Sequence, residues 1–241
     1  MPEEALRLRE AMSRARTVSL GSTAAYKGEL AGAPCILVES GIGKVATATA
    51  AQALCAAGYR TGVLVLGIAG GITAEVHLGD VLVATHAVQH DLDARPFFPR
   101  SHVPHLGQSA FPSDERLRAR CVEAARALTL GLVGARPGAL GAEPPKVLEG
   151  LLLTGDQVIA TRRRRETLSR DFPGALGVDM ETAAVAQVCY QNGVPWAAVR
   201  IISDGLGDRI NPARVLDYAA TVATAFLRDV ATRVLADAAR V

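Results

Sequence analysis

Residues 177–204 read GVDMETAAVAQVCYQNGVPWAAVRIISD. Within them, Asp179-Met180-Glu181 ends an apolar strand and begins an amphipathic helix over 180–191. Residues 196–202, WAAVRII, then predict a strand that is apolar on both sides, as buried parallel strands are. This strand–helix–strand order is typical of a parallel sheet in an α/β fold.

The same alternation continues along the rest of the chain. Apolar runs predict further strands at 34–39, 62–66, 80–88 and 147–154. Helical spacing of apolar residues predicts helices at 3–16, 44–57 and 213–237. No linker divides the chain, so residues 1–241 are predicted to form a single domain with a mostly parallel sheet covered on both faces.

Composition excludes several function classes. The chain has 241 residues, of which 49% are hydrophobic, too many for a disordered protein. Its 26 Lys and Arg nearly balance its 24 Asp and Glu, so we expect no nucleic-acid partner. No run of uninterrupted apolar residues reaches the length of a membrane span. The N-terminus lacks the apolar core of a secretory signal, which predicts a cytoplasmic location.

Three stretches interrupt the regular pattern. Residues 90–116 hold four prolines and three of the five phenylalanines, and a loop of this length is expected to be functional or to contact a partner. Residues 131–147 are rich in Gly, Ala and Pro and are expected to be irregular. The run Arg162-Arg163-Arg164-Arg165 is interpreted as a solvated helix face rather than as a nucleic-acid site.

Candidate site residues lie at strand ends. Two glycine-rich turns, 40–44 and 67–71, follow strands, and such turns let backbone amides approach a ligand. Glu181 and Asp204 also follow strands, and ligands of open α/β sheets bind at the carboxyl ends of strands. Two carboxylates there would be costly unless solvated, paired or used. The five histidines form no ligand pattern, so neither a metal nor a cofactor is predicted.

Six segments, in order along nearly the whole chain, resemble the purine/uridine phosphorylase superfamily, and within it the 5′-methylthioadenosine/S-adenosylhomocysteine nucleosidases. They are SGIGKVATATA (40–50), LGIAGGI (66–72), VHLGDVLVA (76–84), TGDQVIA (154–160), GVDMETAAVAQVC (177–189) and VPWAAVRIISD (194–204). The resemblance implies a three-layer αβα sandwich with a central mixed, mostly parallel sheet. It also implies hydrolysis of the bond between adenine and ribose, in methionine salvage and the methyl cycle, without a cofactor.

The resemblance also implies the residues of the reaction. Asp204 would be the general acid that protonates N7 as adenine leaves, and Ser203 would orient its loop. Glu181 would bind the ribose hydroxyls, with Met180 under the sugar. Glu4 would be the base that activates water.

The resemblance further implies the surroundings of the substrate. Val158 and Ile159 would lie beside adenine, and Ile68, Ala69 and Gly70 would border the ribose and the water. The loop 90–116 would cover the 5′-substituent at a homodimer interface, with Phe97, and Phe111 or Pro112, reaching across it.

These roles suit the chemistry. Breaking an N-glycosidic bond builds positive charge on ribose, which a nearby carboxylate stabilises. The departing base needs a proton, and an acid on one side with a carboxylate and water on the other repeats the logic of inverting glycosidases. Each proton transfer typically contributes about 10²- to 10⁴-fold in rate.

Three departures from the family pattern leave more than one function open. Relatives begin with a strand before the segment of Glu4, which this sequence lacks, so adding such a strand is expected to raise stability and activity. Val158 stands where relatives often have an aromatic ring, and Ile68 where they commonly have Ser, which keeps a futalosine hydrolase open. A phosphorylase and a weakly active nucleoside-binding module are also open. Two features favour water over phosphate as the nucleophile. Phosphorylases can place phosphate donors where this sequence has Val65 and Ile68, and the acids Glu3 and Glu4 would repel phosphate.

Overall fold

The computed structural model describes residues 2–21, 23–129, 145–206 and 212–238. The N-terminal half contains α1 (Pro2–Ala11), β1 (Ser13–Leu20), β2 (Thr23–Leu30), β3 (Ala33–Val38), α2 (Lys44–Ala56), β4 (Val63–Gly71), β5 (Val81–Gln89), β6 (Phe111–Pro112) and α3 (Glu115–Thr129). The C-terminal half contains β7 (Val147–Thr154), α4 (Arg162–Asp171), β8 (Ala175–Asp179), α5 (Thr182–Asn192), β9 (Trp196–Asp204), α6 (Pro212–Tyr218), a π-helical turn (Ala219–Ala223) and α7 (Thr224–Ala238).

A six-stranded mixed sheet forms the centre of the fold, in the order β6-β5-β7-β8-β4-β9. β5 and β7, β7 and β8, and β4 and β9 pair in parallel. β5 also pairs antiparallel with β9, so the sheet closes on itself. A separate antiparallel sheet holds β1, β2 and β3. The predicted α/β class with a central mixed sheet is therefore confirmed, whereas the closure of the sheet is a feature that the sequence does not predict.

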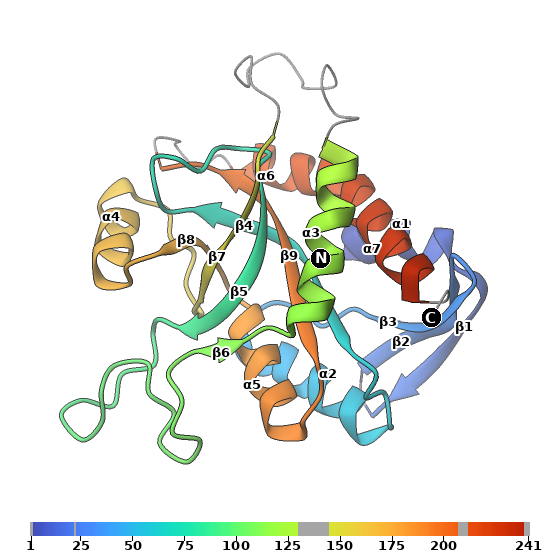
Figure 1. Ribbon diagram of the computed structural model, residues 1–241, viewed down its shortest axis with the longest axis horizontal. Coiled ribbons are helices and arrows are strands. Elements are labelled where there is room, and N and C mark those ends of the chain that lie inside the picture. Colours follow the sequence, from blue (N-terminus) through green and yellow to red (C-terminus); the bar gives the residue numbers. More distant parts are fainter. Residues whose placement is uncertain (1, 22, 130–144, 207–211, 239–241) are drawn as a thin grey trace.

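Helices cover the sheet on both sides. α2 and α5 pack against one face, where Ala51, Cys55, Ala186 and Cys189 belong to one buried cluster. α3 and α7 cover the opposite face through a cluster that includes Cys121 and Leu227 (Figure 1). Among the described helices, none is both long and apolar enough to cross a membrane.

The first predicted helix is partly wrong. Ala5, Leu8 and Met12 are buried as its periodicity requires, but the helix ends at Ala11 and Ser13–Leu20 forms β1. β1 pairs with β2, so the hairpin satisfies backbone groups that a longer helix would have used. The remaining predicted strands and helices correspond to β3, β4, β5, β7, β9, α2, α5 and the segment from α6 to α7.

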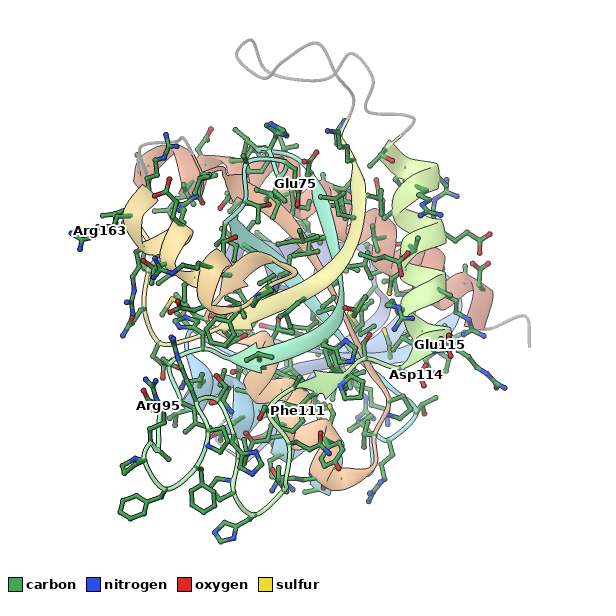
Figure 2. All side chains as sticks on the ribbon, turned by 60° about the vertical axis from the view of Figure 1, so that its left-hand side comes forward. Glu75, Arg95, Phe111, Asp114, Glu115 and Arg163 are labelled. Carbon is green, nitrogen blue, oxygen red and sulfur yellow. The ribbon has the colours of Figure 1, made fainter. Side chains whose placement is uncertain are left out.

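The loop prediction over 90–116 also needs correction. Phe111 lies in β6 (Figure 2) and is 1% exposed. The centroid of its ring lies 5.6 Å from that of the Tyr190 ring. Phe111 therefore belongs to the core and cannot reach a second subunit, although Pro112 is exposed. Residues 131–144 of the second predicted irregular stretch lie outside the described residues.

Candidate active site

A cavity of about 690 Å³ lies where three strands end. Gly70 of β4 pairs with Val178 of β8 on one side and with Asp204 of β9 on the other, so these strand ends converge. Both predicted carboxylates, Glu181 and Asp204, line this cavity. The arrangement is the one in which α/β proteins bind ligands.

Glycine lets the end of β4 approach Asp204 closely. A Cβ atom on Gly70 would lie 3.5 Å from Asp204 Oδ2 and 3.7 Å from Arg165 Nη2. A Cβ atom on Gly71 would lie 3.0 Å from a methyl group of Val76. A Cβ atom at Gly70 would make ordinary contacts, whereas one at Gly71 would press on the core, so close packing accounts for the glycine at 71.

The Asp204 carboxylate has a hydrogen-bond donor at each oxygen. The Ser203 hydroxyl donates to Oδ1 at 2.7 Å, and Arg165 Nη2 pairs with Oδ2. Ser203 also reaches the carbonyl of Ala69 at 3.3 Å. These contacts hold the carboxylate in one orientation at the cavity wall.

Arg165 corrects the interpretation of the arginine run. Arg162, Arg163 and Arg164 are exposed, but Arg165 is 1% exposed and lies on the same helix face as the buried Leu168. Since a buried charge needs a partner, its pairing with Asp204 accounts for its position. Helical spacing between Arg165 and Leu168 is the signal in the sequence that could identify it.

Glu181 lies just before α5, and its side chain is 18% exposed. Its carboxylate accepts hydrogen bonds from the amides of Gly43 at 3.2 Å and Met180 at 3.3 Å. Burial raises the pKa of the Glu181 carboxyl, and repulsion from Asp179 adds to the effect, whereas Arg200 and the two amides oppose it. A carboxylate that is poorly solvated is well suited to accept hydrogen bonds from a ligand.

Arg200 is a site residue that the sequence prediction missed. It lies within the fully buried strand β9, and its Nη2 atom is 2.7 Å from Asp179 Oδ2 and 3.5 Å from Glu181 Oε2. It also donates to the hydroxyl of Thr182 at 2.9 Å. A charged residue in the middle of an apolar strand is the available signal, because such a charge requires buried partners.

Lys44 joins three segments beside the cavity. Its Nζ atom lies 2.7 Å from Asp91 Oδ1, and its backbone amide donates to Asp156 Oδ1 at 2.8 Å. The amide of Asp156 in turn donates to Asp91 Oδ2 at 2.9 Å. The start of α2 is thus tied to the loops that follow β5 and β7.

The remaining predicted residues fall into two groups. Residues predicted to contact substrate line the cavity: Ile68, Ala69, Gly70, Val158, Ile159, Met180 and Ser203. Phe97 does not belong to the lining and is 85% exposed. Glu4 is part of α1, but its side chain lies outside the described residues; the next residue, Ala5, lines the cavity together with Leu8.

A family model described as "Phosphorylase superfamily" matches residues 1–240. A relative from Actinobacillus succinogenes, named 5′-methylthioadenosine/S-adenosylhomocysteine nucleosidase, is 34% identical over 187 residues, which cover 77% of this chain and 74% of the relative. The chain belongs to this superfamily and to its nucleosidase family. As a member, it is a hydrolase that acts on an N-glycosyl bond.

Solved structures agree with this membership. The nucleosidase from Neisseria meningitidis in complex with methylthio-immucillin-A has a TM-score of 0.85 and 30% identity, covering 98% of this chain and 96% of that one. The futalosine hydrolase of Helicobacter pylori strain 26695 has a TM-score of 0.79 and 28% identity, covering 96% and 94%. Both proteins therefore share this nucleosidase's fold, and the Neisseria structure has the higher similarity by both measures.

Proposed function

We propose that this nucleosidase hydrolyses 5′-methylthioadenosine and S-adenosylhomocysteine, releasing adenine and the corresponding thioribose. The observation that carries the proposal is the presence of Asp204 and Glu181 in one cavity at converging strand ends. Asp204 delivers a proton to N7 of adenine, which lets the base leave as a neutral molecule. Glu181 accepts hydrogen bonds from the ribose hydroxyls and faces the positive charge that develops on the sugar.

Glu4 and the adenine contacts complete the proposed site. Glu4 takes a proton from the attacking water, and its helix, α1, contributes Ala5 and Leu8 to the lining of the cavity. Met180 packs under the sugar. Ile159, which is 6% exposed, and Val158 lie beside the base.

Water is the proposed nucleophile because of how the charges of the cavity are paired. Among the lining residues that the structure describes, the cationic side chains are Arg165 and Arg200. Arg165 pairs with Asp204, and Arg200 pairs with Asp179 and Glu181. A phosphate ion would have to compete with these carboxylates, whereas Val65 and Ile68 offer it no polar side chain.

Release of adenine tests this function directly. The purified protein is incubated with 5′-methylthioadenosine, S-adenosylhomocysteine or futalosine, with and without inorganic phosphate, and bases and sugars are separated by chromatography. We expect adenine and free thioribose in the absence of phosphate. Release that requires phosphate and yields a sugar phosphate would overturn hydrolysis. If only futalosine were cleaved, with release of hypoxanthine, the proposed substrates would be wrong. Binding without release would indicate a nucleoside-binding module instead of an enzyme.

We further propose a homodimer that buries the loop 90–116. Large apolar side chains are exposed at Ile42, Val45, Phe97 and Val158, with 64%, 79%, 85% and 70% exposure. The contacts made by Lys44 hold together, at one edge of the cavity, the segments that carry these apolar side chains. A second copy that covers this edge would remove apolar surface from water. It would also let Phe97 approach the 5′-substituent of a substrate bound in the partner subunit. The predicted cytoplasmic location stays a prediction.

Sedimentation equilibrium tests the dimer. Val45→Glu places a charge in the proposed interface and is expected to yield monomers. Ala119→Glu, at an exposed position of α3 on the other face of the sheet, is the control and should leave the sedimenting mass unchanged. A wild-type protein that sediments as a monomer at micromolar concentration would contradict the dimer.

A further inference from the structure

Arg165 reaches three different segments with one guanidinium group. Its Nε atom donates to the carbonyl of Ile159 at 3.1 Å, and Nη1 donates to the carbonyls of Gly71 at 2.9 Å and Gly205 at 2.5 Å. Its Nη2 atom pairs with Asp204 Oδ2. With 1% exposure, the group is fixed in place and shielded from water. The same guanidinium thus connects Asp204 to the segment that the proposed function places beside adenine.

Asp204 changes charge during the proposed reaction. A general acid becomes negative when it gives its proton to the leaving base. Arg165 and Ser203 donate to the two oxygens of Asp204, so the new charge forms between donors that are already in place.

We propose that Arg165 is a positioning residue that drives proton donation by Asp204, an inference that rests on the proposed function. In the step, the proton of the Asp204 carboxyl moves to N7 of adenine, and the electron pair of the C1′–N9 bond moves to adenine. Water then adds its hydroxide to C1′ and gives its other proton to Glu4. The new negative charge on Asp204 forms beside a fixed positive charge, which lowers the energy of the products of the transfer.

Other charged groups also line the cavity: Glu39 after β3, Asp179 at the end of β8, Glu181 before α5 and Arg200 in β9. Asp179 and Glu181 both pair with Arg200. Among the described side chains, Arg165 is therefore the cation bonded to Asp204.

The test measures kcat and KM for adenine release by Arg165→Gln, Arg165→Met and Arg165→Lys. In the two uncharged variants, we expect kcat to fall about 10- to 100-fold with KM nearly unchanged, because the contact acts when the charge forms. Arg165→Lys retains the charge and should keep most of the wild-type kcat. Arg163→Gln, whose side chain points outward from the same helix (Figure 2), is the matched control and should leave both constants unchanged.

Melting temperatures of all variants are measured alongside the rates. A merely structural role would raise KM as kcat falls, and Arg165→Lys would recover no more activity than Arg165→Gln; that result would overturn the inference. If Arg165→Gln fails to fold, Arg165→Met, with an uncharged chain of similar length, decides the question by the same two constants. Absence of adenine release by the wild type would instead contradict the proposed function, so the two failures are distinguishable.

Discussion

Replacing Glu181 with Gln should separate catalysis from stability. The change keeps the shape of the side chain and an oxygen that can accept from the amides of Gly43 and Met180, at 3.2 and 3.3 Å. It removes the negative charge that the proposed function places near the sugar. Removing one such electrostatic contact typically costs about 10²- to 10³-fold in kcat, so we expect adenine release to fall by that factor.

Stability should change in the opposite direction. Because burial raises the pKa of Glu181 in the folded state, ionising this group costs folding free energy. The favourable contribution of the protonated form is complete below the unfolded pKa of about 4.3 and is lost as pH rises through the raised folded value. Gln never ionises, and Arg200 keeps Asp179 at 2.7 Å. At pH 7 the variant should therefore melt at or above the temperature of the wild type.

The assay combines adenine release with thermal melting between pH 4 and pH 8. The melting temperature of Glu181→Gln minus that of the wild type should rise across the titration of Glu181 and then level off. A 2′,3′-dideoxy substrate lacks the hydroxyls that the proposed function assigns to Glu181, and it should lose less activity in the variant than the ribose substrate. Glu75→Gln, at an exposed acid, is the matched control. A variant that melts about 4–8 °C lower at pH 7, equivalent to about 2 kcal/mol, would refute the reasoning.

Three further changes test different parts of the site. Asp204→Asn should reduce adenine release by at least about 10²-fold, and it should also lower the melting temperature, because it leaves the buried guanidinium of Arg165 without its counter-charge. Lys44→Met should destabilise the protein at pH 7 by about 1–3 kcal/mol in thermal melts. Although burial opposes it, the hydrogen bond from Lys44 lowers the pKa of Asp91, so this stabilisation is present above the unfolded pKa of about 3.9 and disappears as pH falls through the folded value. Gly155→Ala would place a Cβ atom 2.3 Å from Nε2 of the fully buried His90. We therefore expect the free energy of unfolding, measured with a denaturant, to fall by about 1–3 kcal/mol. An unchanged melting temperature of Asp204→Asn would contradict the first expectation. The second would be contradicted if Lys44→Met were destabilised relative to the wild type by the same amount at pH 7 and pH 3. The third would be contradicted if Gly155→Ala unfolded at the same denaturant concentration as the wild type.

Hydrophobic patterning predicted the buried elements of the fold better than the exposed ones. β5, β7 and β9 are long apolar runs, and their bounds are close to those expected from sequence. β1 and β2 were missed because SRARTVSL and TAAYKGEL carry charged and small residues and are half exposed in the structure. The antiparallel contact that closes the sheet, between β5 and β9, joins residues more than a hundred positions apart, and local patterns contain no information about it.

The two carboxylates of the site could be predicted from their positions after strands, but their arginine partners could not. Arg165 is one of four consecutive arginines, so composition alone favours a solvated face, and only packing distinguishes it from Arg163. Arg200 lies in an apolar strand whose neighbours become known when the strands are paired. Buried ion pairs depend on contacts between distant segments, which is why their existence follows from the fold rather than from a motif.

A local irregularity of β9 explains why Ser203 and Asp204 act together. In a regular strand, consecutive side chains point to opposite faces, so neighbours cannot bond each other across the strand. Here the pairing with β4 slips by one residue, since Ala69 pairs with Ile202 whereas Gly70 pairs with Asp204. Such a bulge redirects the side chains that follow it. As a result both residues line the cavity, and the Ser203 hydroxyl reaches Asp204 Oδ1 at 2.7 Å, leaving Oδ2 for Arg165. The bulge therefore allows one carboxylate to be held from two sides at the cavity wall.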